Sequence, residues 1–191
     1  MSPFAAGLWG ARPEKGVLRH PPDMYRTTMN PFSNLLRYLQ SNSVPFVVDG
    51  IPSIPAGVEP HGLSVLADAR RATVSPVQLD DRVWLAVMDD SRRLHPDLVR
   101  RSFGGRVVAR VHDEDLPMLF PGCDLKAIPP LGNLFGVPIM IDESIADSPA
   151  LSFAAYDPEV CVTLRTSDFR TLAKPVVAEI AVPLRASIPH S

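Results

Sequence analysis

Residues 119–143 read LFPGCDLKAIPPLGNLFGVPIMIDE, a segment rich in glycine and proline. Proline holds φ near one value and lacks a backbone donor, whereas glycine reaches backbone angles that other residues avoid. The apolar residues 137–141 near its end predict a buried strand. We therefore expect a stiff loop of defined shape that leads into the core, and we call residues 119–143 the signature segment.

This segment resembles the central motif of a known family. Residues 119–132, LFPGCDLKAIPPLG, followed by IDES at residues 141–144, are similar to the YbaK / prolyl-tRNA synthetase editing domains. Members of that family hydrolyse amino acids from wrongly charged tRNA. The resemblance extends from about residue 30 to residue 172. It implies an α/β (α+β) fold, with a mixed, largely antiparallel β-sheet or barrel wrapped by short helices.

The composition is that of a globular protein with many turns. The chain has 191 residues, 46% of them hydrophobic and 21% charged, and its 21 prolines favour turns and edge strands over long helices. A net charge of −2 excludes a generally basic nucleic-acid-binding surface but allows a local basic patch. Cys123 and Cys161 form no disulfide framework or metal motif, so we predict a reducing, cytoplasmic setting. No apolar run reaches membrane-spanning length, and we expect no membrane partner.

The hydrophobic pattern predicts one domain with two appendages. Residues 1–28 show no sustained period, which predicts a flexible extension; residues 29–182 form the predicted domain, and residues 183–191 a loose tail. Asn30 and Pro31 are a typical start for a helix, which should end near residue 41.

Further elements follow along the chain. Residues 63–71 are predicted to be helical, residues 73–79 and 82–88 to form a hairpin, and residues 176–182 to form one strand.

The resemblance also implies a site. In the family, the loop of the signature segment shapes the substrate pocket, and a strand lysine helps to hold the terminal adenosine. The loop residues that map to this role are Ala127, Ile128, Pro129, Pro130 and Gly132. The family lysine aligns near Thr73, and this chain has no lysine between Lys15 and Lys126. Lys126 is therefore the candidate for the missing charge; the alternative is a surface lysine in a turn.

Four other residues are candidates with two readings each. Asp142 either takes part in the chemistry or holds the loop through hydrogen bonds. Tyr156 stands where relatives have a small residue, so its ring either narrows the pocket or turns to solvent. Arg92 and Arg93 either bind RNA phosphates or form a surface cluster with nearby aspartates.

Two functions of different classes follow. The first is a trans-editing deacylase, a hydrolase of translation fidelity that cleaves the ester of a tRNA mischarged with a small amino acid. Its partner would be the aminoacylated 3′ end of tRNA, and we expect no cofactor and no metal. The second is a non-catalytic module of the same fold that recognises an aminoacyl group, a nucleotide or a protein partner. The absent family lysine leaves the choice open.

Overall fold

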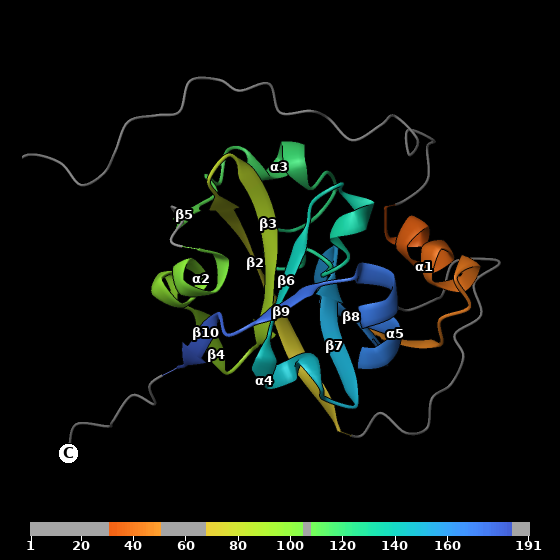
Figure 1. Ribbon diagram of the computed structural model, residues 1–191. Coiled ribbons are helices and arrows are strands. Elements are labelled where there is room, and N and C mark those ends of the chain that lie inside the picture. The colour runs from red at the N-terminus through yellow and green to blue at the C-terminus, as the bar shows by residue number, and fades with distance from the viewer. Residues whose placement is uncertain (1–30, 51–67, 105–107, 185–191) are drawn as a thin grey trace, which may run out of the picture.

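The computed structural model describes residues 31–50, 68–104 and 108–184, and its centre is one twisted sheet (Figure 1). The sheet has the strand order β1-β8-β7-β2-β3-β6-β9, with β5 pairing beside β2. Its strands are β1 (Phe46–Asp49), β2 (Ala69–Leu79), β3 (Arg82–Asp89), β5 (Val108–Arg110), β6 (Ile139–Asp142), β7 (Ala150–Ala155), β8 (Asp157–Arg165) and β9 (Val176–Ala178). A separate two-stranded ribbon joins β4 (Arg92–Leu94) to β10 (Ala181–Pro183).

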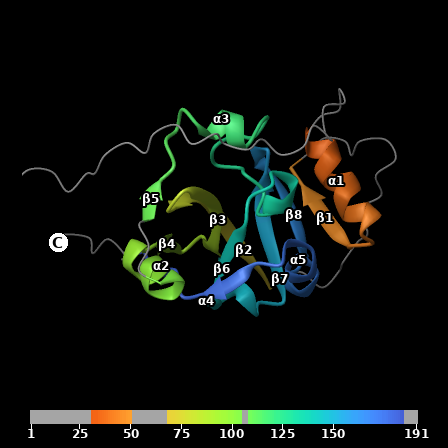
Figure 2. The same cartoon turned by 45° about the horizontal axis from the view of Figure 1, so that its top comes forward.

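Short helices surround this sheet (Figure 2). They are α1 (Pro31–Ser41), α2 (Pro96–Phe103), α3 (Leu116–Leu119), the 3-10 turn η1 (Gly132–Leu134), α4 (Glu143–Ala146) and α5 (Thr166–Ala173). The pairings β2–β7, β3–β6 and β6–β9 are parallel, and the other described pairings are antiparallel. The predicted fold class, a mixed and largely antiparallel sheet wrapped by short helices, is confirmed.

Both faces of the central strand β3 are buried. Leu85 and Val87 belong to the main hydrophobic cluster, which includes the apolar faces of α1 and α5. Ala86 and Met88 point the other way, into a smaller cluster that includes Val99 of α2. Successive side chains of a strand alternate between faces, so β3 separates the two clusters.

Several local predictions are confirmed and two are wrong. Helix α1 buries the four apolar residues of its predicted face, and β2 and β3 form the predicted hairpin. Residues 69–71, predicted as helical, instead begin β2, while residues 63–67 lie outside the described part. The predicted strand 176–182 is two strands, β9 and β10. The predicted extension 1–28 and residues 185–191 of the predicted tail also lie outside the described residues.

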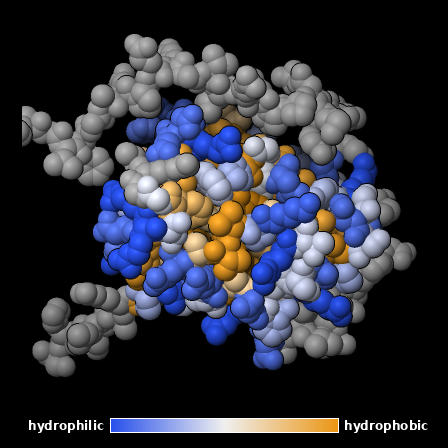
Figure 3. All heavy atoms as spheres, in the orientation of Figure 1, coloured by the Kyte–Doolittle hydropathy of each residue, from blue (hydrophilic) through white to orange (hydrophobic). Residues whose placement is uncertain are grey.

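Strand β9 ends the sheet order and carries exposed apolar residues. Val176 and Val177 are 45% and 40% exposed, and Figure 3 shows hydrophobic residues gathered in the middle of the face that β9 crosses in Figure 1. Within the described residues, no helix is both long enough and apolar enough to cross a membrane.

Candidate functional site

A cleft opens where β2 and β7 stop pairing. The two strands run parallel from the Ala69–Ala150 pair to the Ala72–Phe153 pair, and beyond it each continues with antiparallel partners. The space between them is filled in part by the signature segment, and a cavity of about 130 Å³ remains. We call it the candidate cleft. Its described lining residues are Arg71, Ala72, Thr73, Val74, Asp90, Lys126, Ile128, Phe153 and Ala154.

The size of the candidate cleft limits what it can enclose. Pockets that hold drug-sized ligands measure roughly 300–1,000 Å³. The 130 Å³ found here suits a small chemical group at the end of a larger ligand.

Hydrogen bonds hold the signature segment against the end of β7. The backbone N–H of Tyr156 donates to the Ala127 carbonyl at 2.6 Å, and the N–H of Asp124 donates to the Tyr156 carbonyl at 3.1 Å. The Asp124 carboxylate accepts from the backbone N–H of Lys126 at 2.8 Å. These bonds fix the course of the chain on both sides of Lys126 and so place its side chain at the cleft.

Gly132 is required by close packing. A Cβ added there would lie 2.3 Å from the Val137 carbonyl oxygen and 2.8 Å from Cγ1 of Ile139. All the loop residues predicted to bind substrate are buried, but only Ile128 lines the candidate cleft. The others, Ala127, Pro129, Pro130 and Gly132, are buried and are not among the lining residues.

The candidate cleft carries two cations and one carboxylate. Arg71 Nε lies 4.0 Å from Asp90 Oδ2, and their side chains are 60% and 52% exposed. Lys126 is also exposed and lines the same cleft as Thr73, the strand position to which the resemblance assigns the family lysine. The signature segment therefore supplies a lysine to the cleft, whereas β2 has a threonine at the position of the family lysine.

Tyr156 lies at the edge of this arrangement. Its backbone has φ 67°, a left-handed conformation that residues other than glycine rarely adopt. Its side chain is half-buried against the main hydrophobic cluster. Burial raises the pKa of its phenol, and the nearby Cys123 raises it further. Tyr156 is not among the lining residues; Ala154 occupies the wall instead.

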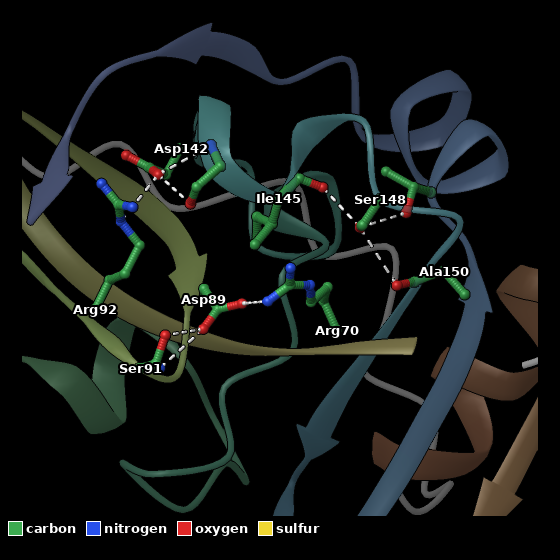
Figure 4. Close-up of polar contacts among 10 residues, drawn as sticks. Arg70, Asp89, Ser91, Arg92, Asp142, Ile145, Ser148 and Ala150 are labelled. Atoms are coloured by element: carbon green, nitrogen blue, oxygen red, sulfur yellow. Dashed lines mark hydrogen bonds and ion pairs between the residues drawn. The ribbon is translucent and has the colours of Figure 1, made fainter. Parts of the chain in front are cut away.

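Asp142 is buried and fully engaged away from the cleft lining (Figure 4). Its Oδ2 accepts the backbone N–H groups of Ile180 at 3.0 Å and Ala181 at 2.9 Å. Its Oδ1 accepts the N–H of Ser144 at 3.1 Å and the Ser144 hydroxyl, and Arg92 Nε lies 3.5 Å away. The carboxylate thus joins the start of α4 to the start of β10.

The two arginines predicted to bind RNA differ in environment. Arg92 Nη2 donates to the Ala181 carbonyl at 2.7 Å, and its side chain is only 25% exposed beside Asp142. Arg93, the next residue of β4, is exposed. Of the pair, Arg93 is the one whose side chain is accessible to a phosphate.

Arg71 and Asp90 were not predicted as site residues. Residues 63–71 were predicted as a helix, but residues 69–71 belong to β2, in which alternate side chains share a face, so Arg71 and Thr73 lie on the same face. This period-two pattern is the sequence feature that could have identified Arg71. Among the described residues, no group of three His, Cys, Asp or Glu side chains could hold a metal ion.

The chain is similar in sequence to one known family and in fold to several solved structures. A family model described as an aminoacyl-tRNA editing domain matches residues 72–172. A solved structure of a proposed trans-editing enzyme for prolyl tRNA synthetase superposes with a TM-score of 0.61 at 16% identity, covering 81% of this chain and 99% of that one. A proposed signal transduction protein from Marinobacter aquaeolei VT8 gives a TM-score of 0.61 at 16% identity, but 80% of this chain spans only 31% of that protein. At these identities the likeness shows a shared fold. No curated protein sequence matches significantly.

Proposed function

Because the chain belongs to the aminoacyl-tRNA editing domain family, we propose that it hydrolyses the ester of a tRNA mischarged with a small amino acid. The family match, residues 72–172, includes every described lining residue of the candidate cleft except Arg71. The observation that carries the proposal is that Lys126 enters the same cleft as Thr73. We propose residues 29–182 as the editing domain, flanked by the extension 1–28 and the tail 183–191.

In the proposed reaction, a water molecule attacks the ester carbonyl carbon and an oxyanion forms. The bond from that carbon to the ribose oxygen then breaks, and the ribose oxygen takes a proton. Charge that develops in a transition state is stabilised best by donors already in position. In this proposal Lys126 is that donor, because backbone hydrogen bonds on both sides of it hold its main chain at the cleft that its side chain lines.

We propose direct attack by water and no covalent intermediate. The described lining contains no serine, cysteine or histidine; its hydroxyl group is that of Thr73, with no histidine in the described lining to take the hydroxyl proton, and its one carboxylate is Asp90. In this proposal Asp90 accepts a proton from the attacking water and also positions Arg71. The Arg71 guanidinium offers paired donors to a phosphate of the tRNA end. Arg93 is a further proposed phosphate contact.

Two observations bear on the substrate. A cleft of about 130 Å³ suits a small aminoacyl group. The similar structure described as a trans-editing enzyme supports the proposal that this chain acts in trans on free charged tRNA. Asp142, whose oxygens are occupied by four hydrogen bonds, is proposed to hold the domain together.

The second candidate is a binding module without turnover. Thr73 at the position of the family lysine favours it, since the strand then lacks the charge that relatives use. In this case the domain would recognise an aminoacyl group, a nucleotide or a protein partner without hydrolysing an ester.

A deacylation assay separates the two functions. The full chain is mixed in excess with tRNAs charged with alanine, proline, serine or leucine, and release of the amino acid is followed over time. The enzyme predicts faster release from one of the small amino acids than in buffer alone. Binding of the charged tRNA without faster release from any of them would select the module.

A further inference from the structure

A second hollow lies between α1 and α5, which are neighbours in both ribbon views (Figure 1, Figure 2). One wall is the end of α1 with the turn after it, residues 38–44, and the other is α5 with Lys174. Its volume is about 450 Å³, compared with 130 Å³ for the candidate cleft, and no described residue lines both. Helix α1 precedes the residues matched by the family model. We call this hollow the α1–α5 groove.

The groove contains a buried carboxylate oxygen without a donor. Oδ2 of Asp168, in the first turn of α5, is buried and accepts no hydrogen bond from any described group. Asp168 as a residue is partly exposed, whereas the two buried acidic residues, Asp89 and Asp142, each accept several hydrogen bonds. A buried charged acceptor without a donor is destabilising, so Asp168 points to a donor supplied from outside the described chain.

Two other polar side chains of the groove, those of Asn42 and Thr171, present acceptors, while the hydroxyls of Tyr38 and Ser43 can donate or accept. The Asn42 amide nitrogen donates to the Tyr38 carbonyl at 2.8 Å, which leaves its side-chain oxygen as an acceptor. The Thr171 hydroxyl donates to the Ser167 carbonyl at 2.9 Å, which leaves its lone pairs. Helices α1 and α5 both end here, and helix C-termini carry partial negative charge. A group with several N–H donors and a positive charge fits this lining.

Lys174, at the C-terminal end of α5, carries a positive charge opposite in sign to that of Asp168 in the first turn. It is exposed and is the one basic residue among the described lining residues. Asp168 and Lys174 together give the groove one negative and one positive side chain, about 9 Å apart along the helix axis at 1.5 Å per residue.

We propose that the α1–α5 groove binds a free amino acid as a zwitterion. Its ammonium group donates to Asp168, and its carboxylate accepts from Lys174. This site is separate from the candidate cleft and does not depend on the proposed hydrolysis.

The test is a titration of the full chain with L-alanine, followed by the backbone amide signals in NMR. Saturable shifts are expected at Asn42, Ser43 and Thr171. Because Asp168→Asn removes the negative charge that faces the ammonium group, it should weaken binding by about tenfold or more, about 1.4 kcal/mol. Lys174→Gln should also weaken the binding of L-alanine. The matched control is Asp147→Asn, an acid 89% exposed that pairs with Arg170.

Single-charge probes test the zwitterion itself. Ethylamine lacks the carboxylate and propionate lacks the ammonium, so both should bind at least several-fold more weakly than L-alanine. Equal binding of ethylamine, shifts confined to Thr73 and Ile128 of the candidate cleft, or unchanged affinity in Asp168→Asn would each overturn the proposal. The retained amide dispersion of Asp168→Asn checks that the variant is folded.

Discussion

The backbone N–H of Tyr156 and the carbonyl of Ala127 are joined by a hydrogen bond of 2.6 Å, which ties the end of β7 to the signature segment. Tyr156 makes this bond from a left-handed conformation with φ 67°. The contact places Lys126, the neighbour of Ala127, at the cleft that Ala154 lines. The geometry of the candidate cleft thus depends on a strained residue.

Replacing Tyr156 should separate strain from packing. Tyr156→Ala loses the ring packing and keeps the unfavourable φ, whereas Tyr156→Gly loses the ring but accepts that φ without penalty. Because the left-handed conformation costs about 1–2 kcal/mol for a residue with a Cβ, the glycine variant should be the more stable of the two by about 1 kcal/mol. Urea unfolding measures this difference. An alanine variant as stable as the glycine variant would show that the conformation is not strained.

Lys126→Ala should slow deacylation by at least tenfold, about 1.4 kcal/mol of transition-state stabilisation. The reason is that Lys126 is the only lysine among the described lining residues. Leu125→Ala is the matched control, since Leu125 is 44% exposed and does not line the cleft. Single-turnover rates give the comparison. If the two variants react equally fast, Lys126 has no part in the reaction.

Asp142→Asn should destabilise the fold by about 3 kcal/mol, because it leaves Arg92 without its buried partner and sets an amide against backbone donors. Its deacylation rate per folded molecule should equal that of the unaltered chain. Urea unfolding and a rate normalised to folded protein test the two statements. A slower deacylation rate in fully folded Asp142→Asn would instead show that Asp142 takes part in the reaction.

The stability of the fold should fall in acid partly through Asp89. Burial alone would raise the pKa of this carboxyl, but hydrogen bonds from Ser91 and the charges of Arg70 and Arg92 outweigh it and hold the pKa below its usual value of 3.8. A lowered folded-state pKa contributes stability that is present above pH 3.8 and is lost as the pH falls through the folded value.

Urea unfolding from pH 7 to pH 3 tests this contribution. Asp89→Asn should be less stable than the unaltered chain at pH 7, and the gap should begin to narrow only as the pH falls below 3.8. Asp97→Asn, at an exposed acid paired with Arg100, is the matched control. A gap between Asp89→Asn and the unaltered chain that stays constant with pH would contradict the argument.

Cys123 should resist alkylation. Burial raises the pKa of its thiol to about 12, so at pH 8 only about one molecule in ten thousand is thiolate. Iodoacetamide at pH 8 should label Cys123 slowly in the folded chain and quickly in urea, as measured by peptide mass. Fast labelling of the folded chain would show that the signature segment opens readily.

The local features were predictable because they depend on neighbours in sequence. The apolar face of α1, the hairpin of β2 and β3 and the buried strand after the loop all follow from periodicity and turn residues. The failed helix over residues 69–71 shows the limit of that reasoning. Parallel pairing of these residues with β7, far away in sequence, makes them a strand, and such pairing has no local signal.

The sequence alone indicated the family and the fold class, because residues 119–132 resemble the central motif of the editing-domain family and that resemblance implies the fold. The glycines and prolines of this run restrict its backbone without help from distant residues. Only the tertiary structure decided the site. It brought Lys126 to Thr73, added Arg71 and Asp90, and placed Asp142 against Ile180 and Ala181. These contacts join distant segments through strand register and side-chain direction, and a one-residue change of register would turn each side chain to the opposite face.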